Sequence, residues 1–221
     1  MKRIKPYIKL VRPSNWIKNL IILLPTLLAG KFSAQSFANI TLGFVSFSIL
    51  ASAGYIINDI RDIGKDRQHA RKKLRPLASS EAGVDVAYYI AVLLFLLGSI
   101  TSFMLGYRVF LIGMGYFVLN YFYSIYGKNF RFIDVLILAS FYVIRIFYGA
   151  EISDVPLTGW FLATITTSVL ALSLNKRYME CKISEQHLIP GRGYSKDDAI
   201  LLHSLMINFA TASIIFLNIQ D

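Results

Sequence analysis

The stretch FANITLGFVSFSILASAGYIINDIRDIGKD, residues 37–66, decides the fold class. Its first part, Phe37–Ile57, is uncharged and mostly apolar over the length that an α-helix needs to cross a bilayer, about 20 residues. Its second part begins with Asn58 and Asp59 and is densely charged. The pattern predicts a transmembrane helix that ends in an acidic site at the membrane surface.

The composition of the whole chain agrees with a membrane protein. Of its 221 residues 55% are apolar and 16% are charged, whereas soluble domains carry about 25% charged residues. The net charge of +10 fits cytoplasmic loops that lie beside anionic lipid. We therefore expect the membrane as a partner, and no nucleic acid. The single cysteine, Cys181, excludes an intrachain disulfide.

We predict an all-α fold, a polytopic membrane helix bundle of about seven spans that forms a single domain over residues 1–221. The first span is short and contains Pro25, so a kink or tilt is expected there. The predicted spans are Trp16–Gly30, Phe37–Ile57, Val86–Leu105, Val109–Tyr126, Phe132–Gly149, Leu157–Leu174 and Ala199–Ile219.

The distribution of charge orients these spans. With the N-terminus in the cytoplasm, twenty of the 23 Lys and Arg residues fall on the cytoplasmic side, as the positive-inside rule requires. The two long polar loops, Ile60–Asp85 and Asn175–Asp198, then share that side. We predict a multi-pass protein of the cell membrane whose N-terminus and active site face the cytoplasm.

The acidic residues after the second span predict a metal site. Asp59, Asp62 and Asp66 are spaced i, i+3, i+7, which puts three carboxylates on one face of a continued helix. Such like charges repel unless a cation offsets them, and oxygen ligands suit Mg²⁺. We expect these three residues to be the catalytic and metal-binding residues, with Asn58 beside them. The alternative is a solvated helix end in which the carboxylates pair with neighbouring basic residues, Arg61, Lys65 and Arg67.

Other polar residues are candidates for substrate binding, and each has a structural alternative. The basic run after the acidic residues suits an anionic substrate or is an ordinary cytoplasmic loop. The turn that ends the sixth span is either a cationic wall for phosphates or an ion-paired helix turn. An arginine inside the fifth span needs a phosphate or carboxylate partner. These candidates are Lys18, Asn58, Lys72, Arg75, Arg145, Lys176, Arg177 and Glu180.

Together these residues resemble the UbiA superfamily of intramembrane prenyltransferases. The resemblance is carried by Arg12-Pro13 with Trp16-Ile17-Lys18-Asn19, by Asn58-Asp59-x-x-Asp62-x-x-x-Asp66, and by Arg75-Pro76. Within the superfamily the chain is most similar to the decaprenyl-phosphate phosphoribosyltransferases. That similarity lies in Asp66-x-x-His69-x-x-Lys72-x-x-Arg75-Pro76, in Tyr142-x-x-Arg145 and in Lys176-Arg177-Tyr178-x-Glu180.

The resemblance implies about nine spans around a central cavity, Mg²⁺ as cofactor, and polyprenyl phosphate and phosphoribosyl diphosphate as substrates. It adds Tyr142 to the substrate-binding candidates. Many members carry a second Asp-rich motif where this chain has Lys176-Arg177, and a basic second site fits a sugar diphosphate better than an aromatic acceptor. Ala70 and Ser80 depart from the usual proline and glycine. Because the chain ends one span after the second motif, we expect it to lack the last two helices.

Three alternatives remain open. The first is a prenyltransferase of the same superfamily that uses a prenyl diphosphate to alkylate an aromatic or other acceptor. The second is an ion-coupled transporter, although the acidic residues lie at one membrane face rather than at the midplane, where transporter sites usually lie. The third is an inactive, truncated membrane protein.

Overall fold

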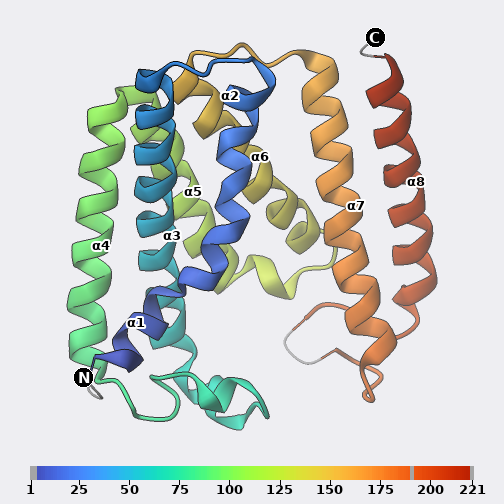
Figure 1. The fold of residues 1–221 in the computed structure, drawn as a ribbon. Coiled ribbons are helices and arrows are strands. Elements are labelled where there is room, and N and C mark those ends of the chain that lie inside the picture. The colour runs from blue at the N-terminus through green and yellow to red at the C-terminus, as the bar shows by residue number, and fades with distance from the viewer. Residues whose placement is uncertain (1–3, 190–191, 220–221) are drawn as a thin grey trace. The chain divides into compact units, whose positions relative to one another are not determined.

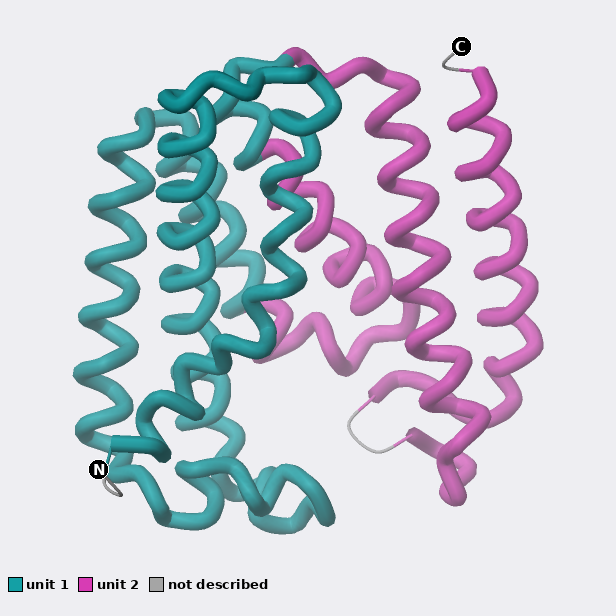
Figure 2. Tube along the Cα trace, viewed as in Figure 1, with its two compact units in different colours: residues 1–121, 148–155 teal, residues 122–147, 156–221 magenta. Residues whose placement is uncertain are grey.

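The computed structural model describes residues 4–189 and 192–219. The chain divides into two compact units, which Figure 2 distinguishes by colour. Unit 1 comprises residues 1–121 and 148–155, and unit 2 comprises residues 122–147 and 156–221. The boundaries fall inside the fifth and sixth α-helices, so each of these two helices contributes residues to both units.

The described residues form helices and loops, with one isolated β-bridge between Leu188 and Ser195, which confirms the predicted all-α fold (Figure 1). The α-helices are α1 Lys5–Val11, α2 Leu24–Leu28, α3 Ala34–Gln68, α4 Val84–Leu105, α5 Tyr107–Ile125, α6 Ile133–Ser153, α7 Gly159–Ile183 and α8 Asp198–Ile219. The 3₁₀-helices are η1 Pro13–Leu23, η2 Lys72–Leu74 and η3 Gly127–Asn129.

Within the described residues, five helices are long and apolar enough to cross a membrane, and the chain is a multi-pass membrane protein. These are α3, α4, α5, α6 and α8, which match the second, third, fourth, fifth and seventh predicted spans. The other two predicted spans fall on η1 with α2 and on α7, which do not meet this criterion of length and hydropathy. In α7 the length of 25 residues is sufficient, but the helix ends in the polar run 175–180.

The first predicted span is a 3₁₀-helix over most of its length. The 11 residues of η1 begin at Pro13, and the 5 residues of α2 carry Pro25 in their first turn. A 3₁₀-helix rises about 2.0 Å per residue and an α-helix about 1.5 Å, so this segment extends about 30 Å. It is therefore as long as a hydrocarbon core is thick, about 30 Å, although the same residues would be too short as an α-helix.

Polar contacts join η1 to α3 at regular intervals. Trp16 Nε1 donates to Ser52 Oγ at 3.0 Å, and Asn19 Nδ2 donates to Ser48 Oγ at 2.9 Å. Three residues of a 3₁₀-helix and four residues of an α-helix both advance about 6 Å, so the two antiparallel helices stay in step. Three residues per turn also put Asn19 and Ile22 on one face of η1, and both are buried.

Close backbone approach and ring packing hold the rest of unit 1 around α3. Gly98 of α4 lies against Leu50, where an added Cβ would be 3.0 Å from the Leu50 backbone nitrogen. On another side, the Phe47 ring contacts Tyr116 of α5 and Tyr148 of α6, at centroid distances of 4.5 and 5.0 Å. Helix α3 is therefore the central element of this unit.

Unit 2 is built on the pairing of α7 with α8. Near one end of this pair the Trp160 and Phe216 rings lie 6.1 Å apart, and further along Ser168 Oγ and Ser213 Oγ share a hydrogen bond of 2.5 Å. Near the other end, buried side chains from α6, α7, α8 and the loop 184–197 form one apolar cluster: Val135, Leu174, Cys181, Ile189, Tyr194 and Leu202.

We predict that Gly149→Ala destabilises the protein, because an added Cβ would lie 1.9 Å from the Ile22 carbonyl oxygen of η1. Backbone cannot yield as a flexible side chain does, so we expect a loss of about 2 kcal/mol or more in stability. Melting of the purified protein in detergent measures it. The matched control is Gly115→Ala in α5, where nothing lies within 4 Å; equal melting temperatures for the two variants would contradict this packing.

Candidate functional site

The C-terminal end of α3 carries the predicted acidic residues. With 35 residues α3 is about 50 Å long, which exceeds the thickness of a hydrocarbon core, so its last turns extend beyond the apolar span. Asp59 and Asp66 lie there on one face of the helix, and they are only 2% and 3% exposed. Buried carboxylates are costly unless they are paired, so their partners define the site.

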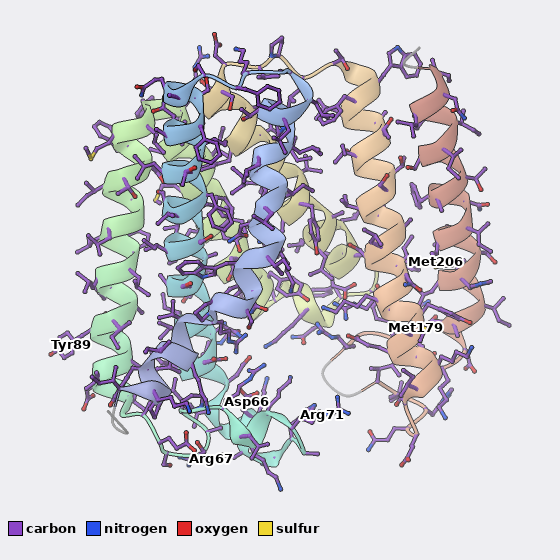
Figure 3. All side chains as sticks on the ribbon, viewed as in Figure 1. Asp66, Arg67, Arg71, Tyr89, Met179 and Met206 are labelled. Atoms are coloured by element: carbon purple, nitrogen blue, oxygen red, sulfur yellow. The ribbon has the colours of Figure 1, made fainter. Side chains whose placement is uncertain are left out.

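Two arginines from different segments supply those partners. Arg12 Nη2 donates to Asp59 Oδ1 at 2.5 Å and to Asp59 Oδ2 at 2.6 Å. Arg75 Nη1 donates to Asp59 Oδ1 at 3.0 Å and to Asp66 Oδ2 at 2.7 Å. Figure 3 labels Asp66 together with Arg67 at the end of α3. We call Arg12, Asp59, Asp66 and Arg75 the arginine–aspartate cluster.

A bend in the backbone brings Arg12 to this cluster. Helix α1 ends at Val11. Arg12 follows with a left-handed φ of 53° and ψ of 57°, and Pro13 then begins η1. The bend is held by Ser52, whose hydroxyl donates to the Val11 carbonyl at 2.7 Å. The Arg12 guanidinium also lies 5.5 Å from the centre of the Tyr55 ring, a distance typical of a cation–π contact.

Apolar packing brings Arg75 to the same place. The residue follows η2 with extended backbone, and Pro76 and Leu77 directly after it are buried. Leu77 belongs to an apolar cluster with Leu10 of α1 and Ile56 of α3. The loop after α3 is therefore anchored beside the helix end, and Arg75 reaches back to both carboxylates.

The structure brings together only part of the predicted site in unit 1. Asp59, Asp66 and Arg75 are in contact, while Asn58 and Asp62 lie nearby on α3 and are half-buried. Lys18 and Lys72 are exposed. Arg67, one of the basic residues of α3 in the structural alternative, donates to the Ala78 carbonyl at 3.2 Å and to Ser80.

Arg12 is the residue of this cluster that was not among the predicted site residues. The available signal was Arg12-Pro13 just before the first span. Nothing in the local spacing pairs that arginine with a carboxylate 47 positions away.

The donor set of the cluster fits a divalent cation. Asp59 and Asp66 already hold one positively charged nitrogen between them, and oxygen ligands are those that Mg²⁺ prefers. Within residues 4–189 and 192–219, however, no three Asp, Glu, His or Cys side chains converge closely enough to hold a metal ion. Asp59 and Asp66 are the residues of this cluster that would hold a metal ion, and Arg75 Nη1 lies between them.

Unit 2 contains a second network of charges, built around Arg177. This guanidinium is 1% exposed; its Nε donates to Asp134 Oδ2, and its Nη1 donates to Glu180 Oε2 at 2.5 Å. Its Nη2 donates to the Tyr123 hydroxyl at 3.2 Å, and Arg192 donates to the same hydroxyl at 3.1 Å. The i,i+3 ion pair that was one of the two predictions for this turn is present, while Lys176 beside it is exposed.

The loop 184–197 is tied to this network by Tyr194. Its hydroxyl donates to Asp134 Oδ1 at 2.6 Å and accepts from the Phe132 backbone N–H at 2.7 Å. Burial, and then the hydrogen bond to Asp134, raise the pKa of the Tyr194 hydroxyl far above its ordinary value. The hydroxyl therefore remains a donor at any physiological pH. Sequence reasoning missed Asp134, Tyr123 and Tyr194, which lie far from Arg177 in the chain.

The fifth-span candidates lie together on α6. Arg145 is 3% exposed and its Nη1 donates to the Phe141 carbonyl at 2.5 Å. Its guanidinium carbon is 5.6 Å from the centre of the Tyr142 ring. The predicted pair Tyr142 and Arg145 is thus in contact.

The fold is that of a multi-pass helical membrane protein, and the carboxylates and arginines buried near the end of a span mark a candidate functional site. Residues 19–180 match the model of the UbiA prenyltransferase family, and the chain belongs to this family of transferases.

Two curated relatives illustrate the similarity. The chain is 28% identical to the nodulation protein NoeC of Azorhizobium caulinodans over 216 residues, which cover 96% of this chain and 70% of NoeC. It is 34% identical over 185 residues to the decaprenyl-phosphate phosphoribosyltransferase of Corynebacterium glutamicum, covering 81% of this chain and 55% of that protein. The chain therefore spans little more than half the length of the second relative.

The fold agrees with a solved structure. A UbiA homologue from Archaeoglobus fulgidus bound to GPP and Mg²⁺ matches with a TM-score of 0.75 at 19% identity, covering 98% of this chain and 76% of that one. The predicted resemblance to the UbiA superfamily, near the decaprenyl-phosphate phosphoribosyltransferases, is confirmed.

We predict that Asp134→Asn destabilises unit 2 by about 3 kcal/mol, because removing one partner of a buried ion pair leaves an uncompensated charge. The control is Asp197→Asn, since Asp197 and its partner His187 are 81% and 67% exposed and such pairs contribute less than about 1 kcal/mol. Titration of the purified variants with a denaturing detergent measures both. If the Asp134→Asn variant were as stable as the control, the buried charge of Arg177 would not need this carboxylate as its partner.

Proposed function

We propose that this chain transfers 5-phosphoribose from phosphoribosyl diphosphate to a polyprenyl phosphate and releases pyrophosphate. The observation that carries the proposal is the arginine–aspartate cluster, in which two buried carboxylates and two arginines converge beyond the end of a membrane span. Carboxylates can hold a metal ion against a diphosphate, and arginines bind phosphate oxygens in bidentate fashion. The similarity to decaprenyl-phosphate phosphoribosyltransferases supports the choice of substrates.

The proposed reaction requires little acid–base catalysis by the protein. A phosphate oxygen of the lipid forms a bond to C1 of the ribose, and the bond from C1 to the diphosphate oxygen breaks with its electron pair on the pyrophosphate. Because the nucleophile is already an anion, no strong general base is needed. The work of the site is to hold two anionic substrates together and to stabilise the charge that develops on the leaving group.

Residues of the cluster divide this work. Asp59 and Asp66, with Asp62 beside them, would hold Mg²⁺, which when bound neutralises and orients the leaving diphosphate. Arg12 and Arg75 would bind its phosphate oxygens. Both guanidiniums are already in place, with side chains 22% and 28% exposed, so a substrate from the aqueous phase can reach them.

The position of the cluster suits a reaction between a lipid and a water-soluble sugar phosphate. The polyprenyl tail stays in the bilayer while the phosphate reaches the membrane surface, where the end of α3 lies beyond the apolar span. We propose that this surface is the cytoplasmic face of the cell membrane, because basic residues concentrate in the segments on that side.

A second candidate function is transfer of a prenyl group from a prenyl diphosphate to another acceptor. The solved UbiA homologue bound to GPP and Mg²⁺ favours it, since a metal site of this kind can hold either diphosphate. Against it, Lys176 and Arg177 stand where many family members carry a second Asp-rich motif. Because Arg177 is buried and paired with Asp134 and Glu180, Lys176 is the residue of this pair that favours the more anionic sugar donor.

The test uses membranes that contain the chain, labelled phosphoribosyl diphosphate, polyprenyl phosphate and Mg²⁺. We expect label in the lipid fraction, and a loss of about 100-fold or more in Asp59→Ala and Asp62→Ala, because charge stabilisation of the leaving group is lost. Asp197→Ala is the matched control, since Asp197 is exposed in the other unit.

Size-exclusion profiles in detergent establish that each variant is folded. Absence of labelled lipid with wild-type protein, together with alkylation of an acceptor from a prenyl diphosphate, would replace the proposal by the second candidate. Loss of labelled lipid in Asp197→Ala as well would show that the effect is not specific to the acidic site.

A further inference from the structure

One nitrogen of the arginine–aspartate cluster lies between two buried carboxylates. Arg75 Nη1 lies between the two buried carboxylates, 3.0 Å from Asp59 Oδ1 and 2.7 Å from Asp66 Oδ2. Both oxygens belong to residues spaced i, i+7 on one face of α3, so the helix itself fixes the gap that this nitrogen fills.

The charges of the cluster balance among its own four residues. Asp59 and Asp66 contribute two negative charges, and Arg12 and Arg75 contribute two positive charges. Because Asp59 and Asp66 are almost fully buried, this pairing avoids the large cost of unpaired charge in a place with little water. The same balance means that a divalent cation cannot simply be added, since it would meet a guanidinium already at its position.

We propose that Arg75 is an internal counter-ion: it lies between the two carboxylates before substrate binds, and a divalent cation that arrives with a diphosphate displaces it onto that diphosphate. The proposal rests on the acidic metal site of the proposed function. It assigns Arg75 two alternating partners, the carboxylates before substrate binding and phosphate oxygens afterwards.

The attachment of Arg75 allows this exchange. Its backbone is held by the buried residues Pro76 and Leu77 that follow it, whereas its side chain is 28% exposed. The guanidinium can therefore turn toward the aqueous side without unfolding the loop. Arg12 differs because both of its hydrogen bonds to carboxylates go to Asp59, so its release would free only one carboxylate.

The exchange couples the two ligands. A cation alone must expel Arg75 into water, whereas a cation with a diphosphate gives the expelled guanidinium a new anionic partner. Metal should therefore bind weakly alone and tightly with a diphosphate, and by linkage each ligand strengthens the binding of the other by the same factor. A purely phosphate-binding Arg75 would produce no such weakening of metal binding in the absence of diphosphate.

The test is equilibrium dialysis of Mn²⁺ against the full chain in lipid nanodiscs, with and without inorganic pyrophosphate. We expect Arg75→Gln to bind Mn²⁺ alone about tenfold or more tightly than wild type, because a like charge a few ångströms away is removed. Pyrophosphate should tighten Mn²⁺ binding strongly in wild type and only slightly in Arg75→Gln. The control is Arg67→Gln, which removes an equal charge from a side chain bonded to Ala78 and Ser80; we expect an affinity within about twofold of wild type.

Two outcomes would overturn the inference. The first is that Arg75→Gln binds Mn²⁺ alone no more tightly than wild type while pyrophosphate still promotes Mn²⁺ binding to wild type. The second is that Arg67→Gln gains as much affinity as Arg75→Gln, which would reduce the effect to net charge. If Mn²⁺ binds no variant under either condition, the metal site of the proposed function fails and the inference fails with it.

A second pair of variants guards against misfolding. Arg75→Lys keeps the positive charge, so it should bind Mn²⁺ alone as weakly as wild type. If Arg75→Gln does not give a folded protein, Arg12→Gln tests the same principle at Asp59, with a smaller gain in affinity because Arg75 remains between the carboxylates.

Discussion

Unit 1 depends on the pairing of the buried Asp59 carboxylate with two arginines that are remote from it in the chain. Without Arg12 and Arg75 a charge that is almost fully buried at the end of α3 would be unpaired, at a cost that exceeds most single interactions. The pairing also joins three segments: the bend after α1, the end of α3 and the loop before α4. The same atoms that stabilise this corner are those we propose for substrate binding, so stability and function share one set of charges.

The parts of this arrangement that could be predicted are those encoded in local spacing. The apolar run before Asn58 predicts a span, and Asp59 and Asp66 at i, i+7 predict one face, because helix geometry converts sequence intervals directly into directions. The structure confirms the helix and its shared face, in which both carboxylates are buried. The sequence also predicts Arg75, Arg177 and Glu180 as candidates, because clusters of charged residues are easily recognised in an apolar chain.

Partners that lie far apart in the sequence could not be predicted in this way. Arg12 meets Asp59 beyond a left-handed bend at Arg12 itself, and Arg177 of α7 meets Asp134 in the part of α6 that belongs to the same unit. The spacing of residues within one segment does not predict contacts of this kind with a distant segment. The 3₁₀ geometry of η1 was missed for a related reason: the hydropathy of a short apolar segment gives its length in residues, whereas its rise per residue is decided by packing against α3.

The matched rise of η1 and α3, three residues against four, limits how the length of η1 can vary among related proteins. Removing one residue from a 3₁₀-helix turns everything beyond the deletion by about 120°, and removing three restores the direction. Because Trp16 and Asn19 must both meet serines of α3, insertions or deletions inside η1 should be tolerated in threes if α3 changes by four in the same interval. Related proteins whose lengths differ here would keep the ratio of three residues in η1 to four in α3. Gaps in their alignment would then reflect the type of helix rather than a variable loop.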